Sequence, residues 1–107
     1  TIKKNLLGIS KNIHQIIPSA KMVNNFDWIS KISLLDFLKL QGKCFSVNAM
    51  LTRDSVKDRL EDPNRGISFT EFTYQLIQGE DFRHLFSTEQ CLLQVGGSDQ
   101  WSNILSG

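Results

Sequence analysis

Three polar side chains recur at spacings of four and three residues in a largely apolar stretch: Tyr74, Gln78 and Asp81. At 100° per residue of an α-helix they fall within about 60° of one another. A phenol, a carboxamide and a carboxylate each cost roughly 1–3 kcal/mol when they are buried without a hydrogen-bond partner. A bound polar ligand would supply such partners. An ordinary solvated helix face, or partners elsewhere in a core, would explain the same spacing.

A second group of polar residues follows a glycine pair, in the run Gly96-Gly97-Ser98-Asp99-Gln100. Glycines between an apolar strand and a helix start leave backbone N–H groups open to a ligand, and the carboxylate and amide that follow can bind a sugar hydroxyl. This pattern is typical of a nucleotide or small-molecule site at the edge of an α/β sheet. A glycine pair after a strand is also common in simple turns.

The helix that carries the first group has the best-defined start in the chain. Ser68 and Glu71 have the spacing of a capping box, and Ile67 and Phe72 that of a hydrophobic staple. The pattern predicts a helix to about residue 86, apolar on most of its circumference and therefore buried. Residues 80, 83 and 84 are expected on its solvent face.

The other expected elements follow from apolar periodicity, caps and breakers. Most of them are helical, with an apolar, buried-type strand over residues 91–95, which favours a fragment of an α/β domain over a free-standing bundle. We expect helices over residues 6–17, 33–40 (capped by Ser33 and stopped at Gly42), 45–51, 52–60 and from Ser98 or Asp99 onward, strands over 21–25 and 91–95, and a surface turn over 62–66.

Size and composition exclude several classes of protein. The chain has 107 residues, enough for one small domain. Its net charge of +1 gives no positive field that would bind nucleic acid. Cys44 and Cys91 lie far apart in sequence without a CxxC motif or a nearby histidine, so we expect reduced thiols and no metal site. No apolar run approaches membrane-spanning length, and we expect a soluble protein of a reducing compartment. The abrupt start and end suggest a piece of something longer.

Five blocks of this chain closely resemble bacterial-type tyrosyl-tRNA synthetases, which are class I aminoacyl-tRNA synthetases. The blocks keep the family's order and spacing from about Lys21 to Gly107, and such a match is highly specific. They are residues 23–28, 45–48, 66–72, Gln78 with Asp81 and Phe82, and 93–101.

The resemblance implies a fold and a domain organisation. Residues 1–107 would form part of a Rossmann-like catalytic domain of α/β class, mostly helical with one or two parallel strands. Residues 26–70 would be a connective insert at a homodimer interface, with Phe69 as the best interface residue, although an ordinary core phenylalanine fits the sequence equally well. Residues 68–107 would form a helix–strand–helix unit that carries part of the tyrosine and adenylate site.

The resemblance also implies roles for the polar residues at the amino-acid site. Tyr74 and Gln78 would hold the α-ammonium group of the substrate L-tyrosine, and Asp81 would accept a hydrogen bond from its phenol. Gln100 would lie beside the substrate carboxyl group, and Asn25 would orient Asp81 from behind. A carboxylate that needs a hydroxyl partner rejects phenylalanine strongly, because it would otherwise be left unpaired.

At the nucleotide, the resemblance places Gly97 and Asp99 against the ribose of the adenylate. ATP would be a substrate, with Mg²⁺ in the parent reaction and no tightly bound cofactor. No residue of this chain is expected to act as a catalytic nucleophile, since activation rests on positioning and charge stabilisation. The parent would act on tRNA(Tyr) as a homodimer, away from membranes, in a bacterial cytoplasm or alternatively an organellar matrix.

Departures from the family pattern are Phe26, where tyrosine is usual, Glu80, where a tyrosine-like residue is usual, and Ser102, where glycine is usual. The HIGH and KMSKS signatures are missing, so we expect the isolated piece to be inactive. Residues 14–17 lack the glycine of the first signature, and residues 21–23 are not the second. Two alternatives remain: a non-catalytic relic that acts as a dimerisation or binding module, and an unrelated small nucleotide-binding domain.

Overall fold

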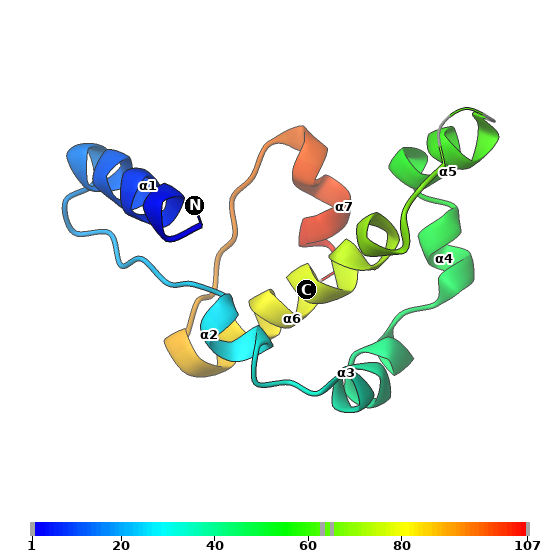
Figure 1. Cartoon of the computed structure of the whole chain (residues 1–107), viewed down its shortest axis with the longest axis horizontal. Coiled ribbons are helices and arrows are strands. Elements are labelled where there is room, and N and C mark those ends of the chain that lie inside the picture. Colours follow the sequence, from blue (N-terminus) through cyan, green and yellow to red (C-terminus); the bar gives the residue numbers. More distant parts are fainter. Residues whose placement is uncertain (1, 63, 65, 107) are drawn as a thin grey trace.

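The longest helix, α6 (Phe69–Glu89), runs through the middle of the molecule, and the other elements are arranged around it (Figure 1). This computed structural model describes residues 2–62, 64 and 66–106, without the side chains of Asp54 and Ser55. Two residues of the expected turn over 62–66, Pro63 and Arg65, lie outside the described residues. The remaining elements are α1 (Ile2–Ile16), α2 (Phe26–Ile29), α3 (Leu34–Leu40), the 3-10 turn η1 (Gly42–Cys44), α4 (Val47–Leu51), α5 (Asp54–Glu61), the 3-10 turn η2 (Ser98–Gln100) and α7 (Trp101–Ile104).

Local capping sets the start of α6, as the sequence predicts. The Ser68 hydroxyl accepts from the Glu71 backbone N–H at 3.2 Å, and the Glu71 carboxylate accepts from the Ser68 backbone N–H at 3.1 Å. Two of the four unpaired N–H groups of the first turn are thereby satisfied. The helix runs to Glu89 rather than to about residue 86, and it ends at Gln90, whose φ of 54° is left-handed.

The helices before α6 also agree with the sequence pattern. Ser33 caps α3 by accepting from the Asp36 backbone N–H at 3.1 Å. That helix ends at Leu40, and Gly42 opens the short turn η1 instead of forming the cap itself. Helices α4 and α5 occupy the two short segments expected to be helical. The single turn α2 was not predicted, because four residues are too few for a periodic signal.

The two expected strands are not confirmed. Within the described residues no β-strand is formed: residues 21–24 and 91–95 have no regular secondary structure, and Asn25 has helical backbone angles at the N-cap of α2. A strand exists only through hydrogen bonds to a neighbouring strand. Apolar content can predict an extended segment, but it cannot provide the partner.

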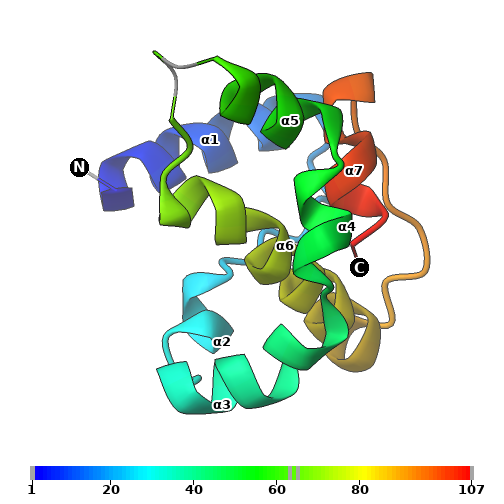
Figure 2. The same ribbon diagram turned by 90° about the vertical axis from the view of Figure 1, so that its right-hand side faces the viewer.

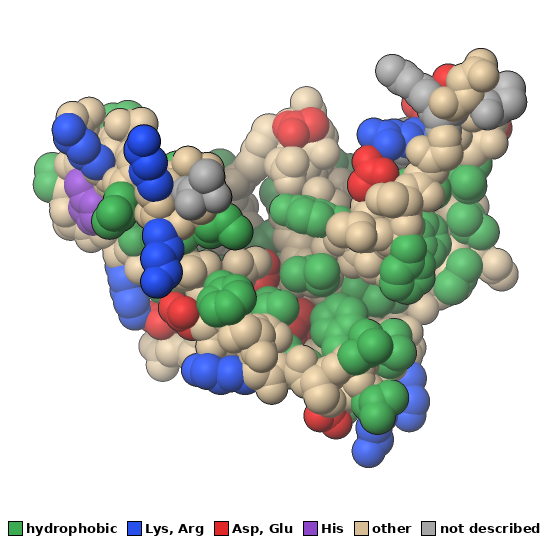
Figure 3. Space-filling model, in the orientation of Figure 1, with side chains coloured by type: hydrophobic (Ala, Val, Ile, Leu, Met, Phe, Trp, Pro, Cys, Tyr) green, Lys and Arg blue, Asp and Glu red, His purple; other side chains and the backbone are tan. Residues whose placement is uncertain are grey.

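Much of the apolar surface is left uncovered by this chain. The accessible surface is 8619 Å², whereas a compact protein of 12.2 kDa exposes about 6,100 Å². The radius of gyration is 15.9 Å, against about 13 Å for a compact domain of this length. Among the described residues the buried apolar side chains are Met50, Val56 and Leu76. Figure 3 accordingly shows apolar side chains spread over the surface at the centre and right of the view, around α6 and the α3–α4 region.

Helix α7 packs against α6 and brings the C-terminal end of the chain to the middle of that helix (Figure 2). Gly79 permits this approach, since a Cβ atom there would lie 2.6 Å from the Ser106 carbonyl oxygen and 3.0 Å from Phe45 Cζ. After the long connection that follows α6, η2 brings Gln100 near Tyr74 and Gln78 of that helix, with which it lines a cavity. In the described part of the chain no helix is both long and apolar enough to cross a bilayer.

Candidate functional site

A cavity of about 380 Å³ lies where α2, α6 and η2 meet. Its volume falls within the range of about 300–1,000 Å³ usual for small-molecule sites. Val23, Phe82 and Leu85 supply apolar wall. The polar residues around it are Asn24, Asn25, Tyr74, Gln78, Asp81 and Gln100, with Trp28 beside them. The four residues assigned by sequence to the amino acid, and the residue assigned behind Asp81, therefore line one cavity.

The carboxylate of Asp81 is held by two donors, Asn25 at the N-cap of α2 and Trp28 within it. Asn25 Nδ2 donates to Oδ2 at 3.0 Å, and Trp28 Nε1 donates to Oδ1 at 2.8 Å. An ionised carboxylate offers about four acceptor positions. Two positions remain for a donor that enters the cavity, and the direction of the carboxylate is fixed before any ligand arrives.

Gln100 comes to this cavity from the far end of the chain. Its Nε2 donates to Asp99 Oδ2 at 3.0 Å, and its Oε1 accepts from Asn103 Nδ2 at 3.2 Å. Both partners lie within three residues of it. The amide orientation is therefore set locally by η2 and α7, whereas its position beside α6 depends on how α7 packs.

Asp99 and Gly97 are arranged differently from the amino-acid residues. Asp99 lines a neighbouring depression of about 510 Å³, and Tyr74 stands between the two because it lines both. Gly97 is not among the residues that line either one. Its φ of −68° is open to any residue, but a Cβ atom there would lie 2.5 Å from Asp99 Oδ1. The small residue leaves room for the Asp99 side chain to fold back over it.

The expectation that α6 is buried around the polar stripe is wrong in part. The buried positions of α6 are Gln75, Leu76, Gly79 and Glu80. The stripe lies at the edge of that face, since Gln78 and Asp81 are half-buried and Tyr74 is 57% exposed. Phe69, the proposed interface residue, is 76% exposed at the start of the helix.

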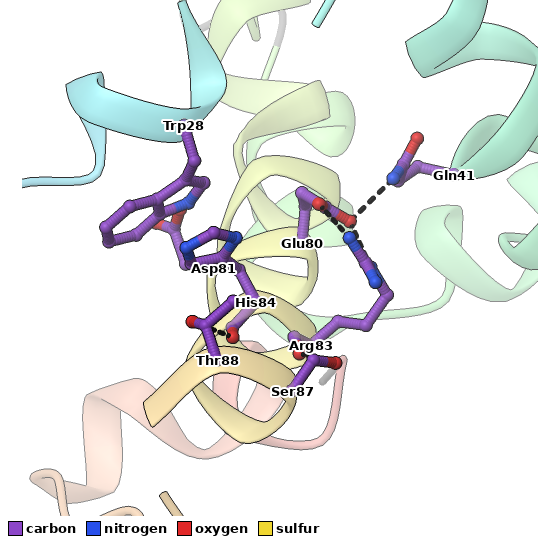
Figure 4. Close-up of polar contacts among 8 residues, drawn as sticks. All are labelled: Trp28, Gln41, Glu80, Asp81, Arg83, His84, Ser87 and Thr88. Atoms are coloured by element: carbon purple, nitrogen blue, oxygen red, sulfur yellow. Dashed lines mark hydrogen bonds and ion pairs between the residues drawn. The ribbon is translucent and has the colours of Figure 1, made fainter. Parts of the chain in front are cut away.

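The sequence pattern predicted Glu80 on the solvent face of α6, and this prediction is wrong, because Glu80 is only 2% exposed. Its carboxylate accepts from Arg83 Nε at 2.7 Å and Nη2 at 2.6 Å, and from Gln41 Nε2 at 2.5 Å (Figure 4). The hydrogen bonds from Arg83 hold the pKa of Glu80 below its ordinary value, against the raising effect of burial, and the bond from Gln41 and the charges of Arg83 and His84 lower it further. The cluster ties α6 to the end of α3.

Sequence reasoning missed two aromatic residues of this region. Trp28 donates to Asp81, and the ring of His84 stacks on the Trp28 indole with centroids 4.3 Å apart and planes 11° from parallel. The sequence did hold a signal for these contacts. Asn25 and Trp28 are three residues apart, as are Asp81 and His84, and residues at this spacing share a helix face. The single turn that makes the first spacing meaningful was not predicted.

Metal and thiol chemistry find no support in the residues described. No group of three His, Cys, Asp or Glu side chains in this part of the chain is arranged to hold a metal ion. Cys44 and Cys91 are free thiols, both exposed. What the site offers is hydrogen bonding: an oriented carboxylate, four amides and a phenol around a small cavity.

Comparison with known proteins gives a family match over the whole chain. The family model described as "tRNA synthetases class I (W and Y)" matches residues 1–107. The tyrosine–tRNA ligase of Flavobacterium johnsoniae is 47% identical over 114 aligned residues, which cover 100% of this chain and 26% of that protein. The tyrosine–tRNA ligase of Staphylococcus saprophyticus is 51% identical over 111 residues, covering 99% and 26%. The chain thus spans about a quarter of the length of these relatives.

Solved structures give the same result. A C-terminally truncated mitochondrial tyrosyl-tRNA synthetase of Coccidioides posadasii matches with a TM-score of 0.70 and 43% identity, over 78% of this chain and 22% of that one. The corresponding enzyme of Aspergillus nidulans matches with a TM-score of 0.70 and 37% identity, over 98% of this chain and 31% of that one.

Proposed function

The chain belongs to the class I tRNA synthetases (W and Y), and on this premise we propose that it is part of a tyrosine–tRNA ligase. The parent protein activates L-tyrosine with ATP to tyrosyl-adenylate and transfers the tyrosyl group to tRNA(Tyr). Relatives named as tyrosine–tRNA ligases, about half identical to this chain, support the choice of tyrosine.

The observation that carries the proposal is the oriented carboxylate of Asp81 in the small cavity. The phenol O–H of a bound tyrosine donates to Asp81. Gln78 and Tyr74 lie one and two turns away from Asp81 on the same face of α6, and they accept from the α-ammonium group. Gln100 faces the other end of the amino acid, beside its carboxyl group, and Asn25 keeps Asp81 in place.

The nucleotide lies beyond the carboxyl end of the amino acid. Asp99 accepts from a ribose hydroxyl, and Gly97 lets the ribose approach the backbone there. Activation joins a tyrosine carboxylate oxygen to the α-phosphorus of ATP and releases pyrophosphate, without a covalent bond to the protein. The described residues include no group of three His, Cys, Asp or Glu side chains that could hold a metal ion, and we assign no metal ligand to this chain and no step to a metal.

Substitution of Asp81 by alanine in the full-length protein tests the assignment. The substrate phenol loses a hydrogen bond to a charged group, worth about 1.5–3 kcal/mol, so the preference for tyrosine over phenylalanine should fall about 10- to 150-fold. The preference is measured as the ratio of kcat/KM values in ATP–pyrophosphate exchange. Glu61→Gln, at an exposed position on α5, is the control. Unchanged preference in the Asp81 variant would refute the role.

Three finer points belong to the same proposal. Residues 91–95 pair as a strand of a Rossmann-like sheet in the full-length protein, because Leu92, Leu93 and Val95 are 84%, 78% and 89% exposed here and need a cover. The exposed Phe69 lies at a homodimer interface. The protein works in a bacterial cytoplasm or, like the two solved fungal relatives, in mitochondria.

The competing function is a non-catalytic module that keeps only a dimerisation surface. The exposed apolar side chains of α3, such as Leu34 and Leu35, fit a dimerisation surface. They fit equally well a domain surface that the rest of the enzyme covers. Pyrophosphate exchange by the full-length protein separates the two. The flanking sequence does so as well, since a ligase requires a HIGH-like segment before this chain and a KMSKS-like segment after it.

A further inference from the structure

His84 and Trp28 form a stacked pair at the cavity that contains Asp81, and Trp28 lines that cavity. The ring centroids are 4.3 Å apart and the planes 11° from parallel. The two residues come from different elements, His84 from α6 and Trp28 from the single turn α2. Figure 4 shows the imidazole lying against the indole, with Asp81 beside both. An aromatic pair of this geometry contributes more than the burial of its surface alone.

The stack controls the direction of a hydrogen bond. The indole has a single polar donor, Nε1–H, which lies in the plane of the ring. That donor meets Asp81 Oδ1 at 2.8 Å. Any rotation of the indole moves the donor away from the carboxylate, so the group that fixes the indole plane also fixes this bond. Asn25 holds the other oxygen independently, through Oδ2.

His84 itself stands apart from the proposed tyrosine site. Trp28 lines two cavities, the one of about 380 Å³ that contains Asp81 and a larger depression of about 780 Å³. His84 lines only the larger one. Its influence on a ligand in the smaller cavity therefore runs through Trp28 and Asp81.

We propose that His84 is a positioning residue for side-chain selection: by stacking on Trp28 it keeps the indole N–H on Asp81 and the carboxylate aimed at the substrate phenol. This inference rests on the proposed function, since it assigns a specificity role within that site. Removing the imidazole frees the indole to rotate, and Asp81 then keeps only the bond from Asn25. The carboxylate becomes less well oriented, which weakens the contact that phenylalanine cannot make.

The test compares variants of the full-length protein in ATP–pyrophosphate exchange with tyrosine and with phenylalanine. His84→Ala removes the stack, and His84→Gln removes the ring while keeping much of the side-chain volume. His84→Phe restores an aromatic partner for the indole. Ser87→Ala is the matched control, because Ser87 is exposed one turn further along α6 and its hydroxyl donates to the Arg83 carbonyl of its own helix.

His84→Ala and His84→Gln should lower the ratio of kcat/KM for tyrosine to kcat/KM for phenylalanine by about 2- to 10-fold. This range corresponds to the energy of an aromatic pair. The loss should fall mainly on the KM for tyrosine. His84→Phe should stay close to the wild-type ratio, and Ser87→Ala should not change it. The Trp28 indole N–H resonance of the tyrosine-free protein should shift in His84→Ala and His84→Gln and stay unchanged in Ser87→Ala.

Two results would overturn the inference while leaving the proposed function intact: an unchanged ratio in both disrupting variants of a tyrosine-specific protein, or a ratio in His84→Phe as low as in His84→Ala. An unshifted Trp28 resonance in His84→Gln would do the same without any activity measurement. A wild-type protein that lacks tyrosine-dependent exchange would instead refute the proposed function, and this inference with it.

Discussion

Replacing Glu80 by glutamine removes a negative charge from a side chain that is 2% exposed, at almost constant volume. The wild-type carboxylate accepts three hydrogen bonds, two from Arg83 and one from Gln41. A glutamine has one acceptor oxygen, and its NH₂ group meets donors where the second carboxylate oxygen was. Gln41 can relieve part of this conflict by turning its amide, because its Oε1 has no partner in the structure.

The cost follows from the partners. A hydrogen bond to a charged group contributes about 1.5–3 kcal/mol, but the Arg83 side chain is 60% exposed, and water can replace much of what it loses. The bond from Gln41 is half-buried and lacks that compensation. We therefore expect Glu80→Gln to reduce the free energy of unfolding of this region by about 1–3 kcal/mol at neutral pH.

The contribution of Glu80 also depends on pH. Because the pKa of Glu80 in the folded protein lies below its ordinary value of 4.5, the unfolded chain takes up a proton at higher pH than the folded one. The stabilisation is fully present above about pH 4.5 and is lost as the pH falls through the folded pKa. The glutamine variant should lack this acid-dependent loss.

Hydrogen exchange read out by peptide in the full-length protein measures the effect locally, without assuming two-state unfolding of a large protein. Peptides that cover α3 with η1 and the middle of α6 should exchange faster in Glu80→Gln. Glu61→Gln is the control, since its 3.8 Å ion pair with Lys57 is exposed and worth little. Equal exchange in the two variants, or identical acid dependence in wild type and Glu80→Gln, would refute the reasoning.

Two further predictions concern packing. Gly79→Ala should lower the local free energy of unfolding by about 1–3 kcal/mol, because its Cβ atom would lie 2.6 Å from the Ser106 carbonyl oxygen. Gly8→Ala in α1, with no atom within 4 Å, should raise it by about 0.5–1 kcal/mol. Hydrogen exchange of peptides from α6 and α1 checks both, and equal effects would contradict the assigned contact. The proposed homodimer interface makes a third prediction, which sedimentation equilibrium checks: the full-length protein should be a dimer, Phe69→Asp a monomer and Phe69→Tyr a dimer. A dimeric Phe69→Asp would remove Phe69 from the interface.

The sequence alone determined the local parts of this structure. The start of α6 follows from Ser68 and Glu71, and the start of α3 from Ser33, because each cap is a hydrogen bond between residues three apart. The common face of Tyr74, Gln78 and Asp81 follows from helix geometry as soon as the helix is known. The family resemblance named at the sequence level is confirmed by the family match over the full chain.

Only the tertiary structure decided what those local parts meet. Asn25 and Trp28 reach Asp81 across 56 and 53 residues, and Gln41 reaches Glu80 across 39. The apolar periodicity of α6 placed Glu80 on the solvent face. Periodicity describes one helix in isolation, so it cannot show that the end of α3 covers one side of α6. The expected strand over 91–95 is not confirmed for a related reason: the hydrogen bonds of a strand need a partner from outside the segment. Contacts within one turn are encoded by neighbours in sequence, whereas a binding cavity depends on the packing of distant segments.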